Sequence, residues 1–218
     1  YMKQKISMVG IASGLILGNL GYTHCCIEDI GILRSIPNIQ IISPADSLET
    51  IKAFEACLKS DTSSYIRLTG GSNNPMVYQK DYNFRIGKSV KIIDGSDISI
   101  FCNGAMVSEC IKVSKILGDK KIKASVINMH TVKPIDEEVI FNELNKSKLI
   151  VSVEEHNVIG GLGSAISECI VKFKNSTPML KIGIDDYYSK GGSYNYLKDL
   201  YGLTAEKIVD SIENKINE

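Results

Sequence analysis

Short apolar runs alternate along this sequence with stretches in which apolar residues recur at helical spacing. The runs, several of them rich in β-branched residues, predict strands at 6–11, 39–43, 65–68, 97–103, 123–129, 149–154 and 179–184. Helical spacing predicts helices at 27–35, 48–59, 107–117, 136–146, 163–174 and 204–217. Strands that alternate with helices in this way are typical of a parallel sheet covered by helices. The pattern therefore places the chain in the α/β class.

A cluster of Thr, Gly, Ser, Asn and Pro at 69–75 separates two groups of these elements. The first group has fewer elements than the second, and its first strand lies at the start of the sequence. The second group alternates strands and helices through to a closing amphipathic helix. We therefore predict a truncated α/β unit at 1–78, a linker at 79–94 and a complete α/β unit at 95–218.

The charges of the chain balance, with 25 Lys and Arg against 25 Asp and Glu and a pI near 7.0. A general nucleic-acid or membrane-surface binder would need a surplus of basic residues, so both partner classes are excluded. Hydrophobic residues at 44% and charged residues at 23% exclude disorder as the main state. The 6 Cys show no CxxC spacing and the chain has only 3 His, so a zinc site is not expected. Free thiols in a reducing cytoplasm fit this usage best.

The beginning of the sequence imitates a secretory signal, because Lys3 and Lys5 precede an apolar run at 6–20. That run contains three glycines and ends in Gly-Tyr-Thr-His rather than at a small-residue cleavage site. It is also too short to span a bilayer, which takes about 20 residues. A buried strand that enters a glycine-rich loop is the better interpretation.

Several sequence blocks occur together in a specific order. The first group reads GNLGYTHCCIED at 18–29, LRSIPN at 33–38, IISPAD at 41–46 and YIRL at 65–68. The second reads VSVEEH at 151–156 and GGLGSA at 160–165. Together they resemble the transketolase family of thiamine diphosphate enzymes, in the later part of the pyrimidine-binding domain and in the C-terminal domain. The resemblance covers nearly the whole chain. It implies a truncated parallel-sheet pyrimidine-binding domain and a complete, smaller, mixed-sheet α/β C-terminal domain.

Enzymes of this family bind the cofactor between two domains, usually from two subunits. A domain with a GDG…N motif holds the diphosphate and Mg²⁺, and a glutamate of the pyrimidine-binding domain protonates the ring. This sequence lacks the motif and begins after that glutamate, so the resemblance implies a chain that is not a complete catalyst. It implies transfer of a two-carbon ketol unit between sugars, with sugar phosphates as the expected class. Thiamine diphosphate with Mg²⁺ would be held mainly by an absent part.

The resemblance also implies an N-terminal transketolase-like subunit or domain as partner, a homo-oligomer, and a small sugar as substrate. Nucleic acid and membrane are not expected, and the expected compartment is the cytoplasm. No residue of this chain is assigned to the cofactor or to a metal. Within the cofactor class, a 1-deoxyxylulose-5-phosphate synthase and a 2-oxoacid dehydrogenase β-type polypeptide stay open as alternatives. From another class, the alternative is a non-catalytic assembly module that keeps the fold for dimerisation.

His24 is the main candidate for a catalytic and substrate-binding residue. It follows a glycine-rich turn and precedes a helix, which would bring it to the carboxyl edge of a parallel sheet, where such folds bind ligands. An imidazole there can donate to a substrate oxygen and exchange protons near neutral pH. The resemblance aligns His24 with a substrate-contacting histidine. A structural hydrogen bond at a helix start is the alternative.

Arg67 is the second substrate-binding candidate, because a guanidinium can bind phosphate through a fork of two hydrogen bonds. Its place inside a strand favours a structural ion pair instead. Departures from the family leave the substrate open. Leu20 stands where many relatives have an Asp that contacts substrate hydroxyls, and Tyr22 replaces a Pro. Gly70 stands where relatives that act on phosphorylated sugars have an Arg.

The remaining candidates have simpler structural interpretations. Asp46 is expected to cap a helix rather than act as an acid. Glu28 and Asp29, in a first helical turn, are expected at a solvated or interface position. The glycines at 160–163 are expected to make a tight strand-to-helix turn rather than a dinucleotide site. The Glu-Glu-His run at 154–156 is not expected to bind a metal, because adjacent residues of a strand point to opposite sides.

Overall fold

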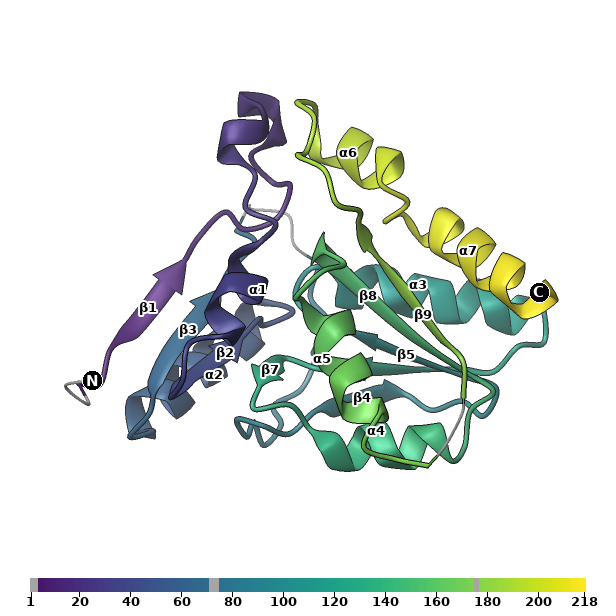
Figure 1. Ribbon diagram of the computed structural model, residues 1–218, viewed down its shortest axis with the longest axis horizontal. Helices are drawn as coiled ribbons and strands as arrows, with labels where there is room; N and C mark the ends of the chain where they lie inside the picture. The colour runs from purple at the N-terminus through teal and green to yellow at the C-terminus, as the bar shows by residue number, and fades with distance from the viewer. Residues whose placement is uncertain (1–3, 71–74, 175–176) are drawn as a thin grey trace.

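Two β-sheets form the framework of the structure, a computed structural model that describes residues 4–70, 75–174 and 177–218 (Figure 1). In these residues the first sheet has four strands in the order β1-β3-β2-β7. They are β1 (Ser7–Gly10), β2 (Ile39–Ile42), β3 (Ser63–Arg67) and β7 (Thr131–Lys133). β3 pairs in parallel with β1 and β2, whereas β7 pairs antiparallel with β2. The first unit thus has a parallel core, and the second unit supplies its fourth strand.

The second sheet is mixed, and its five strands in the described part of the chain follow the order β4-β6-β5-β8-β9. They are β4 (Val90–Ile93), β5 (Ile98–Cys102), β6 (Ala124–Asn128), β8 (Leu149–Asn157) and β9 (Met179–Ile184). β4 joins β6 antiparallel, and the other pairs are parallel. The two sheets confirm the α/β class and the mixed C-terminal sheet.

Helices cover both faces of the second sheet (Figure 1). On one face α3 (Met106–Asp119) and α7 (Ala205–Asn217) pack in the same apolar cluster as Ile100 of β5. On the other face α4 (Glu137–Leu144) and α5 (Leu162–Ile170) pack with Phe101, the next residue along the strand. Because both faces are buried, the strands of this sheet have nearly continuous apolar sequences.

The helices α1 and α2 pack against the first sheet. Ala53 and Cys57 of α2 (Ser47–Lys59) pack against Ile42 and Ile66. The cap of α2 is Asp46, whose Oδ1 accepts a hydrogen bond from the Glu49 amide at 2.9 Å, as the sequence predicts. α1 (Asp29–Arg34) lies between the two sheets.

The sequence pattern does not predict β4, β7 or α6 (Tyr194–Leu200). β4 lies inside 79–94, a segment expected to be a linker, and it forms by pairing with β6. β7 has only three residues and forms because it pairs across the two units. α6 contains two Tyr, one Asn and one Asp among its seven residues, and these are weak helix formers. Positions 71–74 of the turn cluster lie outside the described residues.

The strand interpretation of the signal-like segment is confirmed, but the expectation that this strand is buried is wrong. Met8 and Val9, on opposite faces of β1, expose 38% and 39% of their surface. The reason is that β1 has a partner on one side only within the described residues. In the same residues, we find no helix that is long and apolar enough to cross a membrane.

The two units contact each other closely along α1. The Asn157 amide donates to the Ile27 carbonyl at 2.8 Å, and Arg34 Nη1 donates to the Gly160 carbonyl at 2.8 Å. Gly31 of α1 meets Gly160 so closely that a Cβ added at Gly160 would lie 2.9 Å from the Gly31 Cα. Main chain therefore packs on main chain where the units meet.

Candidate active site

The loop at 14–26, which carries His24, follows β1 and closes on itself. The Gly14 amide donates to the Cys26 carbonyl at 2.7 Å, and the Cys26 amide donates back to the Gly14 carbonyl at 3.0 Å. Between these residues the chain makes two 3₁₀ turns, Gly18–Leu20 and Tyr22–His24. We call residues 14–26 the His24 loop. It lies at the top of Figure 1, beside α6.

His24 is exposed at the end of the second 3₁₀ turn, and its Nδ1 lies 3.1 Å from Thr23 Oγ1. Gly21 separates the two turns with a φ of 95°, a conformation that strongly favours glycine. Leu20 and Tyr22, the two positions that depart from the family pattern, are also exposed. The fold thus brings His24 beyond the carboxyl end of β1 with its imidazole accessible, as the sequence predicts. Its role in catalysis stays a prediction.

Arg67 lies at the carboxyl end of β3 and is buried, with 3% of its surface exposed. Its Nε is 2.9 Å from Asp29 Oδ2, and Tyr65 donates to the same carboxylate at 2.7 Å. Its Nη2 donates to the carbonyls of Cys26 and Glu155, each at 3.1 Å. These contacts are those of the structural ion pair that the position of Arg67 inside a strand favours. A substrate contact by Arg67 stays a prediction.

Asp29 is not solvated, since only 9% of its side chain is exposed, and it lies at the interface between the units. Burial alone would raise the pKa of this carboxyl, but the Arg67 guanidinium and its hydrogen bonds lower it below the usual value. The ion pair therefore stays charged at neutral pH. It fixes α1 against β3 directly below the His24 loop.

The side chains of Glu154, Glu155 and His156 on β8 point to different partners, as expected of adjacent strand residues. Glu154 accepts from the Leu162 and Gly163 amides at 2.6 and 2.8 Å, at the start of α5. Burial raises the pKa of Glu154 to about 7, although these two amides lower it. Because the carboxylate already occupies these amides, the glycine turn has the structural role that the sequence predicts.

His156 is buried and neutral at the interface between the units. Its Nδ1 donates to the Asn157 carbonyl at 2.7 Å, and its Nε2 accepts from the Gly31 amide at 3.3 Å. Burial and, to a lesser extent, the nearby Arg67 charge lower the pKa of His156 to about 4.

Glu155 turns toward the His24 loop, a role that the sequence does not predict. Its Oε1 accepts from the Leu15 amide at 2.6 Å, and its Oε2 accepts from the Tyr194 hydroxyl of α6 at 2.7 Å. Two acidic residues that directly follow the apolar start of this strand are the sequence signal that could have indicated such contacts, since buried carboxylates need partners.

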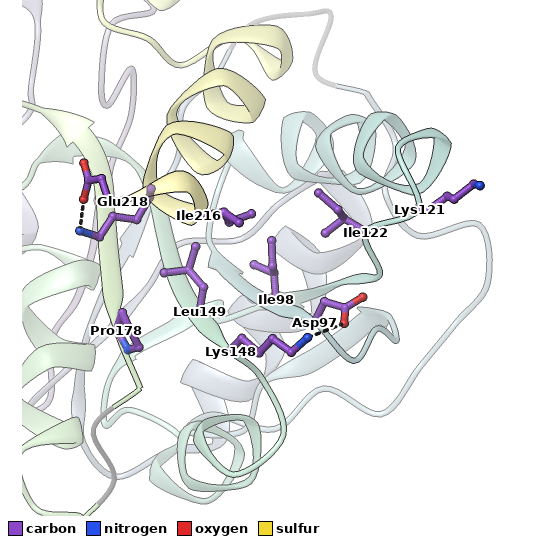
Figure 2. A pocket seen from close by; sticks show the side chains of 10 residues that line it. Asp97, Ile98, Lys121, Ile122, Lys148, Leu149, Pro178, Ile216 and Glu218 are labelled. Atoms are coloured by element: carbon purple, nitrogen blue, oxygen red, sulfur yellow. Dashed lines mark hydrogen bonds and ion pairs between the residues drawn. The ribbon is translucent and has the colours of Figure 1, made fainter.

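A pocket of about 570 Å³ lies elsewhere on the second unit (Figure 2). It is lined by Ile98 and Leu149, the first residues of β5 and β8, together with Ile216 and Lys148. The contacts to the His24 loop come from the other end of β8, at Glu155. The pocket is therefore separate from the candidate active site.

No group of three or more His, Cys, Asp or Glu side chains in the described residues is arranged to hold a metal ion. All six cysteines are free thiols, as expected.

Comparison with known proteins identifies the class to which this fold and loop belong. Residues 1–74 match the family model of the transketolase pyrimidine binding domain. Residues 87–208 match that of the transketolase C-terminal domain. The chain belongs to the transketolase family.

Individual relatives are similar over nearly the whole chain. A 6-deoxy-6-sulfo-D-fructose transketolase subunit of Clostridium sp. is 36% identical over 211 residues, which are 96% of this chain and 64% of the relative. An apulose-4-phosphate transketolase subunit of Actinobacillus succinogenes is 32% identical over 96% of this chain and 68% of its own length. A 1-deoxy-D-xylulose-5-phosphate synthase of Caldanaerobacter subterraneus is 36% identical over 93% of this chain and 33% of its length. The chain thus spans about two thirds or less of these relatives.

Among solved structures, a split gene transketolase described as an inactive beta4 tetramer superimposes with a TM-score of 0.84. It is 30% identical, and the match covers 95% of this chain and 65% of that one.

Proposed function

We propose that this chain is the C-terminal part of a transketolase-like enzyme that transfers a two-carbon ketol unit between sugars, with sugar phosphates as the preferred class. The observation that carries the proposal is the exposed His24, on a loop beyond the carboxyl end of β1, in a chain that matches both transketolase domains in order. Ligands of parallel α/β folds bind at this edge of the sheet.

His24 is the proposed catalytic and substrate-binding group. Its imidazole would donate a hydrogen bond to a substrate hydroxyl or carbonyl oxygen and move a proton at that atom. Arg67 would reach a substrate only if its guanidinium left Asp29, at 2.9 Å, so the proposal does not depend on it.

A second part of the enzyme, on the same polypeptide or a separate one, is proposed to cover β1. Met8 and Val9 are partly exposed on opposite faces of this strand, and Ile11 beyond it is 76% exposed. Apolar residues on both faces of an edge strand favour association with another polypeptide segment. The partner we propose is the N-terminal, cofactor-binding part, within a homo-oligomer in the cytoplasm.

The cofactor proposed for the assembled enzyme is thiamine diphosphate with Mg²⁺, which supplies an electron sink for the ketol unit. The described residues do not fit the metal, because they contain no cluster of ligands for it. We therefore expect the chain alone to bind thiamine diphosphate and Mg²⁺ weakly or not at all. Calorimetry that found micromolar affinity, about −8 kcal/mol, for the chain alone would contradict this.

The decisive experiment is reconstitution. The chain is co-purified with the polypeptide that carries the GDG motif, and ketol transfer between a ketose phosphate and an aldose phosphate is followed by mass spectrometry. We expect products only when both parts, thiamine diphosphate and Mg²⁺ are present, and none from either part alone. A stable complex that turns over no ketose would contradict the proposal and favour an assembly module.

Synthesis of 1-deoxyxylulose 5-phosphate is the second candidate function. It is favoured by the 36% identity to a synthase of that product, equal to the identity with the sulfofructose transketolase subunit. The same reconstituted complex separates the two, because formation of that product would identify the synthase.

A further inference from the structure

The neck of the His24 loop is held by a residue of the other unit. Glu155 Oε1 accepts from the Leu15 amide at 2.6 Å on one side of the neck. On the other side, the Glu155 and Cys26 carbonyls both accept from Arg67 Nη2 at 3.1 Å. A Cβ added at Gly14 would lie 2.2 Å from Glu155 Oε1, so the carboxylate occupies the space beside the glycine. The second unit thus contacts the Leu15 side of the neck directly and the Cys26 side through Arg67.

The middle of the loop is held by the segment that leads into α6. The Gly192 amide donates to the Gly18 carbonyl at 2.9 Å. Leu197 of α6 packs on Gly18, where an added Cβ would lie 2.1 Å from its Cδ1. The first 3₁₀ turn of the loop is therefore seated on α6.

Tyr194 links these two attachments. Its hydroxyl donates to Glu155 Oε2 at 2.7 Å, so it fixes the carboxylate whose other oxygen binds Leu15. The Lys198 ammonium lies 5.0 Å from the centre of the Tyr194 ring and is 2.9 Å from Glu109 of α3. The tyrosine is thereby anchored to the body of the second unit.

We propose that Glu155 and Tyr194 are positioning residues, through which the C-terminal unit holds the His24 loop and so places His24 for its substrate. This inference rests on the proposed function for the role of His24, whereas the attachment itself can be tested on the chain alone. A loop that is correctly placed only part of the time binds substrate more weakly in proportion to that fraction.

The test uses Tyr194→Phe, which removes one hydroxyl and keeps the ring over Lys198. The matched control is Tyr196→Phe, two residues further on, whose side chain is 53% exposed. By hydrogen exchange of the whole chain, we expect peptides covering 14–24 to exchange at least about tenfold faster in Tyr194→Phe and unchanged in Tyr196→Phe. The melting temperature should fall by no more than about 4 °C. Exchange of the loop at the wild-type rate would overturn the proposal.

Glu155 offers a test by conservative rescue. Glu155→Gln keeps an oxygen for the Leu15 amide and presents an amide group that donates to the Tyr194 oxygen, so the loop should exchange as in the wild type. Glu155→Ala loses both contacts and should match or exceed Tyr194→Phe. If Glu155→Ala does not fold, the comparison between Tyr194→Phe and Glu155→Gln still decides. If the His24 loop exchanges as fast in Glu155→Gln as in Tyr194→Phe, the positioning role of the two Glu155 hydrogen bonds is contradicted.

In the reconstituted enzyme, Tyr194→Phe should raise KM about tenfold and change kcat less than threefold. In a His24→Ala background the same change should alter kcat/KM less than threefold, because the two residues act through one contact. Full additivity of the two substitutions would overturn the positioning role. If the wild-type complex transfers no ketol unit, the proposed function fails, and the exchange measurements still determine whether the loop is held as inferred.

Discussion

The central strands of the second sheet and the edge strand β1 of the first differ in how completely they are covered. Every residue of β5, β6 and β8 is buried, because helices lie on both faces of the second sheet. On β1 of the first sheet, three of four residues are exposed and the fourth is half-buried. The second unit therefore has a buried core that stabilises it. The first unit contains the exposed His24, on a loop that is held by contacts with the second unit.

We expect stability and activity to be divided between the units. Substitutions in the second sheet should act on folding, whereas substitutions at the edge of the first should act on association or activity.

The largest effect is expected in the core of the second unit. Phe101 is fully buried between β5 and the helices α4 and α5, so Phe101→Ala should lower the free energy of unfolding by about 3–5 kcal/mol. Val9→Ala on β1 should change it by less than about 0.5 kcal/mol. Urea denaturation of both variants measures the difference. Equal losses would show that the side chains of β1 are as well packed as those of β5.

His24→Ala should reverse this pattern. In the assembled enzyme it should reduce the rate by about 10²–10³, because it removes a hydrogen bond made to the substrate in the transition state. Folding should change little, since the side chain is exposed. Kinetics and a melting curve on the same sample provide both measurements. Activity within about threefold of wild type, together with a melting temperature several degrees lower, would make His24 a structural residue.

A smaller, pH-dependent effect is expected where the units meet. The pKa of His156 is about 4 in the folded chain, below the unfolded value of about 6.5, so the unfolded state binds more protons between these values. The stabilising contribution is present above pH 6.5 and is lost as the pH falls toward 4. The unfolding free energy of the wild type relative to His156→Gln should shrink by about 2 kcal/mol between pH 7 and pH 4.5. A difference independent of pH would mean that the pKa of His156 is the same in the folded and the unfolded chain.

At the edge strand β1 we expect the smallest effect on stability and a measurable effect on association. Light scattering should show the 23.9 kDa chain as a dimer or larger species, and Val9→Lys should shift it toward the monomer. Its free energy of unfolding should change by less than about 0.5 kcal/mol. A wild-type chain that stays monomeric at high concentration contradicts the prediction.

Much of the fold follows from local pattern. β5 and β6 are mostly apolar runs, and α7 repeats its apolar residues at helical spacing, so each is predicted within one residue of its observed bounds. β8 starts where predicted, at Leu149, but continues three residues beyond the predicted end at Glu154. β4 and β7 are missed because each is a short antiparallel strand whose formation depends on a partner distant in sequence. Local propensity does not record such pairing.

The candidate site, like the fold, can be predicted from the sequence only in part. The His24 loop can be located from its glycines and the residues that resemble the family. The partners of Arg67 cannot, because Asp29 is 38 positions away and Glu155 is 88 positions away. From the sequence, a phosphate contact and an ion pair remain alternatives for Arg67. The fold is needed to show that Asp29 and Glu155 lie beside its guanidinium. The same holds for Glu155 and Tyr194, separated by 39 positions.

The contact between Gly31 and Gly160 has a consequence for how the units can vary. With no side chain at either position, main-chain van der Waals radii set the separation of the two units there. A methyl group at Gly160, 2.9 Å from the Gly31 Cα, would act as a wedge. It would lengthen several neighbouring contacts together, including Arg34 to the Gly160 carbonyl and the Gly31 amide to His156. The absence of a side chain at Gly160 thus lets the two units approach closely enough for the hydrogen bonds that join them.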